Sequence, residues 1–193
     1  MKPLASFFMI FLLAACSVPD TRIYSLNLSS GNRDAGGSTD PLVISVTAVP
    51  YLSQPYIVSR TSPYELEVSK YAKWDAAPAE LAKSALKENL SGAGLFREVK
   101  IARAAAGDSF FLRMELKRFE RIDLGREPFG EISLDFELFS PDGKLLSRGA
   151  ITKKALLDDR EYRSLAKGMS LVLSEAVEEV RADVTRAIAK KQL

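Results

Sequence analysis

The strongest constraint on the fold is a long apolar stripe near the C-terminus. Apolar side chains recur every three or four residues from Leu165 to Ile188, with polar residues such as Lys167 and Glu178 opposite. This spacing predicts an amphipathic helix of roughly six turns, which Asp158 or Asp159 would begin. The helix would cover a sheet, and its length leaves open that an outer part contacts another subunit. The stripe comprises Leu165, Met169, Val172, Leu173, Ala176, Val177, Val180, Val184 and Ile188.

The middle of the chain predicts that sheet. Apolar and polar residues alternate over 109–122 and again over 131–139. The phase slips at Lys117-Arg118, as it does at a β-bulge. The segment 140–143 (Ser-Pro-Asp-Gly) predicts a turn before a return strand over 144–152. One polar face on each strand indicates an antiparallel sheet with one solvated side.

The N-terminal half supplies further strands and a first helix. Residues 42–49 are apolar on both faces, as expected of a central strand, and residues 57–68 predict a hairpin. Asp75 is suited to cap a helix with Pro78 in its first turn, and Gly92 and Gly94 are suited to end it. We therefore expect a single α/β (α+β) domain over residues 41–193. Its twisted, mostly antiparallel or mixed sheet would carry two helices on one face.

The first sixteen residues predict export and lipid attachment. A positive start is followed by an apolar run from Pro3 to Ala15, too short to cross a bilayer. The run closes as Leu-Ala-Ala-Cys, which is similar to the lipobox of bacterial lipoproteins. We predict a signal peptide over 1–15, cleavage before Cys16, acylation of the Cys16 thiol and a tether over 16–40. Ser17 after the cysteine favours the outer membrane. An ordinary signal peptide with an incidental cysteine is the alternative.

Two missing residue types restrict the chemistry. The chain has no histidine and a single cysteine, which removes the usual general base and, once Cys16 is acylated, any thiol for a nucleophile, a disulfide or a metal. The formal charge is only +2, which argues against nucleic acid as a partner because phosphate binding needs an excess of positive charge. These features predict a non-enzymatic protein without a cofactor or a metal. A periplasmic hydrolase is the disfavoured rival.

Four segments resemble the ABC-type transport auxiliary lipoproteins, which include the paraquat-inducible protein C type. They are Tyr-Ser-Leu at 24–26, the stretch 46–60, Tyr-Ala-Lys-Trp at 71–74 and Gly-Leu-Phe-Arg-Glu-Val at 94–99. The resemblance covers most of the chain beyond Cys16. Trp74 is followed by Asp-Ala-Ala-Pro, where the family usually has residues like Ala-Glu-Pro. This departure weakens the inference about the contacts of Trp74 more than the resemblance itself.

The resemblance implies a lipoprotein of the Gram-negative envelope that acts in lipid transport. Its partners would be an ABC permease, an ATPase and an MCE-domain protein, and phospholipid and a second copy of the chain are further candidate partners. It would dock to the MCE partner or form part of a conduit between the membranes. The rival function is a structural or assembly accessory lipoprotein of the outer membrane.

Contact residues are sought among large side chains in loops and near helix ends. Tyr51, Leu52 and Tyr56 lie in a proline-bounded loop, where large apolar groups are costly to leave in water. Trp74 is a further contact candidate because aromatic residues concentrate at interfaces, although packing above the first helix is the alternative. The acidic residues Asp123, Glu127 and Glu131 are interpreted as a solvated loop and not as an acid/base pair.

Overall fold

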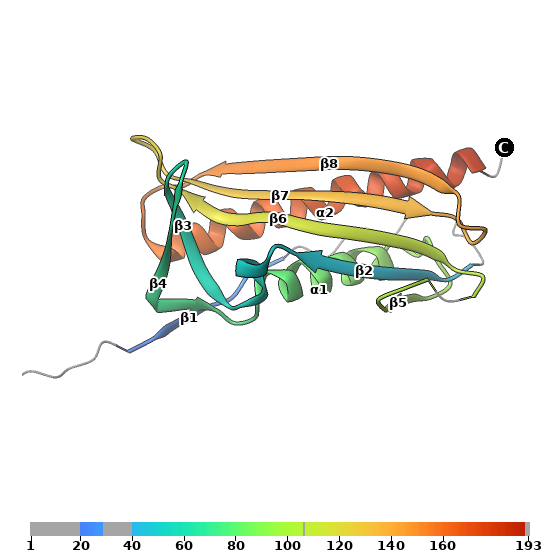
Figure 1. The fold of residues 1–193 in the computed structure, drawn as a ribbon, viewed down its shortest axis with the longest axis horizontal. Coiled ribbons are helices and arrows are strands. Elements are labelled where there is room, and N and C mark those ends of the chain that lie inside the picture. Colours follow the sequence, from blue (N-terminus) through green and yellow to red (C-terminus); the bar gives the residue numbers. More distant parts are fainter. Residues whose placement is uncertain (1–19, 29–39, 106, 192–193) are drawn as a thin grey trace, which may run out of the picture.

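The computed structural model describes residues 20–28, 40–105 and 107–191. Eight strands form one mixed sheet, and both helices lie on the same side of it (Figure 1). The expected single α/β domain with two helices on one face is therefore confirmed. In chain order the elements are β1 (Arg22–Tyr24), β2 (Leu42–Ala48), the 3-10 helix η2 (Pro50–Ser53), β3 (Tyr56–Ser62), β4 (Glu65–Trp74), α1 (Pro78–Gly92), β5 (Val99–Ile101), β6 (Phe110–Ile122), β7 (Phe129–Phe139), β8 (Leu145–Leu156) and α2 (Tyr162–Lys191).

The long strands β6, β7 and β8 form an antiparallel meander. The predicted bulge is present, because Leu116 pairs with Leu134 while Arg118 pairs with Ser133. The predicted turn between β7 and β8 is closed by Ser140, whose amide donates to the carbonyl of Lys144 at 2.9 Å. Gly143 adopts a φ of +79° there, a conformation that glycine reaches at no steric cost. The antiparallel part of the prediction is confirmed for this meander.

Parallel pairing enters through β2. This strand lies between β5 and β6 and runs parallel to both, and its first residues, including Leu42 and Ile44, are fully buried. The expected central strand is thus confirmed, but the sheet is mixed because α1 returns the chain from the β4 end to start β5 beside β2. β3 and β4 form the expected hairpin, and β3 also runs parallel to the end of β6.

Helix α2 covers β7 and β8, and α1 lies over β2 and β5. All nine residues of the predicted stripe are buried, which confirms which face of α2 packs on the sheet. Phe136 on β7 packs against Gly149 on β8, where a Cβ atom would lie only 2.5 Å from the ring. The core is therefore one continuous layer between the sheet and the helices.

Both predicted helix starts need correction. α1 begins at Pro78 with Ala77 at its N-cap and no side-chain cap. Asp75 lies two residues before this N-cap, and its amide donates to the carbonyl of Tyr24 at 3.0 Å, which links β1 to the end of β4. α2 begins at Tyr162, not at Asp158 or Asp159. Asp159 accepts a hydrogen bond from the amide of Glu161 at 2.9 Å and so organises the turn that precedes the helix.

The predicted tether is also shorter than expected. Within the predicted range 16–40, β1 pairs with β4, and Tyr24, Leu26 and Leu28 pack against the core. The amide of Asn27 donates to Oγ of Ser170 on α2 at 3.0 Å. Residues 22–28 therefore pack with the domain, although they lie in the range predicted as a tether. Residues 1–19, with the predicted signal peptide and Cys16, and residues 29–39 of the tether lie outside the described residues.

Candidate interaction surfaces

The predicted contact loop is more buried than the sequence suggested. Pro50–Ser53 form a 3-10 helix, and Leu52 has an exposed fraction of 0%. Tyr51 is partly buried, and its hydroxyl lies 3.2 Å from Oε2 of Glu120 and 3.3 Å from the carbonyl oxygen of Lys117. Burial, followed by the charge of Glu120, raises the pKa of Tyr51. Leu52 is therefore a core residue and not a contact residue, because the 3-10 turn points its side chain inward.

Trp74 is also a core residue. It is 3% exposed, and its ring meets the ring of Phe119 edge to face at 5.5 Å between centroids. The structure supports a packing role for Trp74. The residue it packs against is on strand β6, however, and not on the first helix as the alternative supposed. Tyr56 remains on the surface with 38% of its area exposed, and the ammonium of Lys73 lies 6.0 Å from its ring centre. Of the four predicted contact residues, Tyr56 is the one most available to a partner.

A buried carboxylate pair was not anticipated from the sequence. Glu120 on β6 and Glu131 on β7 are paired directly across the strands, and each is 2% exposed. Two like charges in such positions repel each other, so cations must compensate. Arg60 donates from Nε to Oε1 of Glu120 at 2.7 Å, and Arg118 donates from Nη1 to Oε1 of Glu131 at 2.8 Å.

Further cations complete this cluster. Nζ of Lys154 on β8 lies 2.9 Å from Oε2 of Glu131. Burial would raise the pKa of Glu131, but the hydrogen bonds from Lys154 and Arg118 outweigh it and hold that pKa below the ordinary value. The solvated-loop interpretation is therefore wrong for Glu131, which lies within β7, and it holds for the exposed Glu127. Asp123 is paired with Arg121 at 2.8 Å.

The cluster links two parts of the fold: the β3–β4 hairpin, through Arg60, and the meander, in which Arg118 of β6 and Lys154 of β8 pair with Glu131 of β7. Glu120 and Glu131 lie on strands in which polar and apolar residues alternate, and alternation indicates which residues share a face of a strand. What it lacked was the register: the shift between Leu116 and Arg118 is what brings the two carboxylates opposite each other. The cluster holds ionised, paired groups and is suited to fixing strands together.

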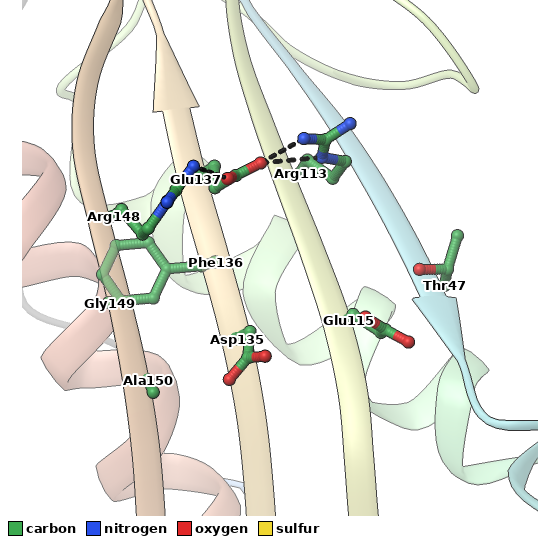
Figure 2. A pocket seen from close by; sticks show the side chains of 9 residues that line it. All are labelled: Thr47, Arg113, Glu115, Asp135, Phe136, Glu137, Arg148, Gly149 and Ala150. Atoms are coloured by element: carbon green, nitrogen blue, oxygen red, sulfur yellow. Dashed lines mark hydrogen bonds and ion pairs between the residues drawn. The ribbon is translucent and has the colours of Figure 1, made fainter.

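The sheet face turned away from the helices carries a shallow depression of about 830 Å³. Figure 2 shows its charged side chains rising from neighbouring strands, with Glu137 between Arg113 and Arg148. Nε of Arg113 donates to Oε2 of Glu137 at 3.0 Å, and Nη2 of Arg148 lies 2.7 Å from Oε1. The pKa of Glu137 is lowered below its ordinary value, mainly by the hydrogen bond from Arg113.

The depression therefore offers a polar surface of paired charges. An ionised carboxylate held by two arginines is a poor proton donor near neutral pH, and its neighbours Glu115 and Asp135 both lie near Lys117, at 2.6 and 3.6 Å. Such a face can bind another polar surface if its charged side chains exchange their present ion pairs for ion pairs with that surface. Among the described residues, no group of three or more acidic, histidine or cysteine side chains is placed to hold a metal ion.

A second depression of about 750 Å³ lies over the first half of α2. Its lining includes Ser25, Asn27 and the end of β8, and Leu156 and Leu171 are exposed. Ser170 also lines it, and its Oγ donates to the carbonyl of Ala166 at 2.7 Å. Across the described ranges, neither helix is both long and apolar enough to span a membrane.

Comparison with known families identifies the chain's relatives. The family model described as "ABC-type transport auxiliary lipoprotein component" matches residues 24–181. The chain belongs to this family. The match begins within β1 and ends within α2, so it spans nearly all of the described domain. Membership assigns the chain to the lipoproteins that accompany ABC-type transporters, and hence to the cell envelope.

Solved structures share the fold. The Xanthomonas campestris protein XCC0632 superposes with a TM-score of 0.78 at 18% identity, covering 89% of this chain and 99% of that one. An uncharacterised protein gives a TM-score of 0.65 at 18% identity over 86% and 99% of the two chains. The hypothetical protein CT253 of Chlamydia trachomatis gives 0.50 at 13% identity over 76% and 96%. No curated protein matches the chain.

Proposed function

We propose that this lipoprotein is a non-enzymatic auxiliary component of an MCE-type ABC lipid transport system. It acts by docking to the MCE-domain partner, or by forming part of a conduit between the two membranes. The observation that carries the proposal is the family match over residues 24–181. Transport of lipid, with phospholipid as the candidate, is the function that the family resemblance implies.

The surface chemistry is in keeping with a role in docking. The charged groups of the sheet depression are already paired with one another, so they offer complementary polar contacts and no free acid or base. Tyr56 adds an aromatic side chain at the rim of the 3-10 turn, and tyrosine is enriched among residues that dominate binding energy. Tyr56 is therefore the contact residue that we propose in place of the buried Leu52 and Trp74.

The anchor proposed for this protein is acylated Cys16 in the outer membrane. A protein with several acyl chains is held stably, since each buried methylene contributes about 0.8 kcal/mol. Cys16→Ala should abolish labelling by a tagged fatty acid, and undiminished label on that variant would disprove the anchor. Sucrose-gradient fractionation tests the membrane, where co-migration with the inner membrane would contradict the assignment.

The decisive test is capture of the MCE-domain protein from crosslinked membranes. Tyr56→Ala should weaken capture, because truncating a hot-spot residue often costs about 2 kcal/mol, or roughly thirtyfold in affinity. Leu145→Ala is the matched control, since Leu145 is 42% exposed at the other end of the sheet. If the wild-type protein captures no MCE-domain protein, the transport function fails and the assembly accessory becomes the better candidate. If the folded Tyr56→Ala variant captures as much MCE-domain protein as the wild type, Tyr56 is not a contact residue, but the transport proposal stands.

A further inference from the structure

Exposed apolar side chains gather at one end of the molecule. Tyr64 is 98% exposed, Ile23 70% and Leu124 52%. They lie on the β3–β4 turn, on β1 and on the β6–β7 connection. Figure 1 shows all three at the end opposite the C-terminus, with β1 at the other end of β4 from the β3–β4 turn. We name this group the apolar end, and its members are Ile23, Tyr64, Leu66, Val68, Tyr71 and Leu124.

These side chains are exposed because neither helix makes an extensive contact with β3 or β4. From Glu65 to Tyr71, no residue of β4 is buried. Leu66 pairs with Arg60 and Val68 with Val58 on β3, while β1 meets β4 only over residues 72–74. Several exposed apolar groups along one edge of a molecule can mark a protein or membrane contact site.

The position of the N-terminus selects between these two classes of contact. β1 is the first described element and lies at the apolar end. Cys16 precedes Arg22 by six residues, and six extended residues reach at most about 20 Å. An acyl anchor on Cys16 therefore keeps β1, and the end of β4 that pairs with it, close to the bilayer.

We propose that the apolar end rests on the lipid bilayer, with the ring of Tyr64 at headgroup level. The proposal rests on the lipid anchor included in the proposed function. Tyrosine suits this depth because its ring is apolar and its hydroxyl is polar. The turn Pro63-Tyr64 carries no charge, so no ion has to be desolvated when it enters the interface.

The charges around the apolar end are of both signs. Arg22 and Lys70 are exposed there, as are Glu65 and Glu67 on β4. Attraction to anionic lipids depends on an excess of cations, and this end has no such excess. The contact is therefore driven by apolar burial, is shallow, and depends little on the anionic lipid content.

This contact sets the orientation of the whole domain. α2 contains 30 residues, which corresponds to a length of about 45 Å, and its C-terminus lies at the opposite end of the molecule (Figure 1). The β7–β8 turn and the end of α2 then point away from the membrane.

The test places a reporter at each end. Because Cys16 is the only cysteine and is acylated in this scheme, Tyr64→Cys and Leu145→Cys each create one free thiol for an environment-sensitive NBD fluorophore. The acylated full-length proteins are reconstituted in phosphatidylcholine vesicles, with and without phosphatidylglycerol. We expect the label at residue 64 to show increased, blue-shifted emission that brominated phosphatidylcholine quenches. The label at residue 145 should stay water-like, and phosphatidylglycerol should change neither signal.

The outcomes separate this proposal from the proposed function. A water-like label at residue 64 in correctly anchored protein overturns the bilayer contact, and capture of the MCE-domain protein is then judged on its own. A lipid-like signal at residue 145 alone overturns the orientation. A photocrosslinker in place of the label at residue 64 tests whether a protein or a lipid contacts this site. A protein adduct in place of a lipid adduct overturns the proposal. If the unsubstituted protein itself takes up the fluorophore at Cys16, the anchor fails, and the proposed function loses its lipoprotein basis.

Discussion

The meander β6–β8 and the β3–β4 hairpin use similar sequences to different effect. In β7, Ile132, Leu134 and Phe136 alternate with polar residues and all three are buried under α2. In β4, Leu66 and Val68 alternate in the same way and both are exposed. The difference is that a helix covers β7 and none covers this part of β4. Alternation therefore defines the face of a strand, and burial depends on what lies over that face.

The two regions are also held by different interactions. The meander is stabilised mainly by the apolar layer shared with α2, since burial contributes about 25 cal/mol per Å² of apolar surface. The hairpin has little of that layer and is tied to β6 by the Arg60–Glu120 pair. We infer that the meander carries the stability of the domain and that the hairpin end is available for contact.

The largest expected effect lies in the meander half. Leu173 on α2 is 0% exposed, so Leu173→Asp buries a charge without a partner and should cost about 4 kcal/mol or more. Domain stability is about 5–15 kcal/mol, so the melting temperature should fall steeply in a calorimetric scan. Glu175→Asn on the exposed face of α2 is the control. Glu178 is a poorer control than its polar position suggested, because it accepts from Asn89 of α1. Equal losses for the two variants would mean that α2 does not carry the stability.

The next effect should be confined to the hairpin. Glu120→Gln keeps the shape of a fully buried side chain but removes the charge that Arg60 needs. Breaking a buried pair costs about 3–5 kcal/mol, and we expect about 2–3 kcal/mol here because Arg60 is partly in water. Hydrogen exchange should accelerate in β3 and β4 more than in β7, whereas the exposed Glu67→Gln should change neither. Uniform acceleration across the sheet would remove the distinction between the two regions.

A smaller, pH-dependent effect is expected at Glu131. Its pKa is lowered in the folded state, so its contribution to stability is fully present above the ordinary glutamate pKa of about 4.3 and is lost as the pH falls through the lowered folded value. Glu131→Gln should therefore cost about 1–2 kcal/mol at neutral pH, from two charge-assisted hydrogen bonds. The gap in melting temperature from wild type should close below about pH 4. A gap of constant size from neutral pH down to about pH 3 would show that Glu131 acts by shape and not by charge.

The smallest effect should come from the tip of the hairpin. Tyr64→Ser removes a side chain that is almost wholly in water, and surface substitutions usually change stability by less than about 0.5 kcal/mol. Chemical denaturation should give the wild-type midpoint, even if association with vesicles is weakened. A clear loss of stability would mean that Tyr64 packs against the domain in solution, which would contradict the contrast drawn here.

The candidate contact residues illustrate what sequence patterns leave undecided. A proline-bounded loop with Tyr51, Leu52 and Tyr56 predicted exposed anchors, yet η2 turns Leu52 into the core and leaves Tyr56 outside. The same holds for Trp74, which is buried and packs against Phe119 of β6. Whether a large side chain in a short connection is exposed depends on the element packed against it, and no local pattern reports that element.

The sequence by itself determined the features that arise within a few residues. These are the buried face of α2, the alternation of β6 and β7, the bulge near Lys117 and the turn at 140–143, because periodicity and turn chemistry are local properties of the chain. The tertiary structure alone decided the parallel neighbours of β2, the pairing of Glu120 with Glu131 and the exposure of Leu66 and Val68 on β4. Each of these joins residues far apart in the sequence, so it follows from which strands pair and which surfaces the two helices cover.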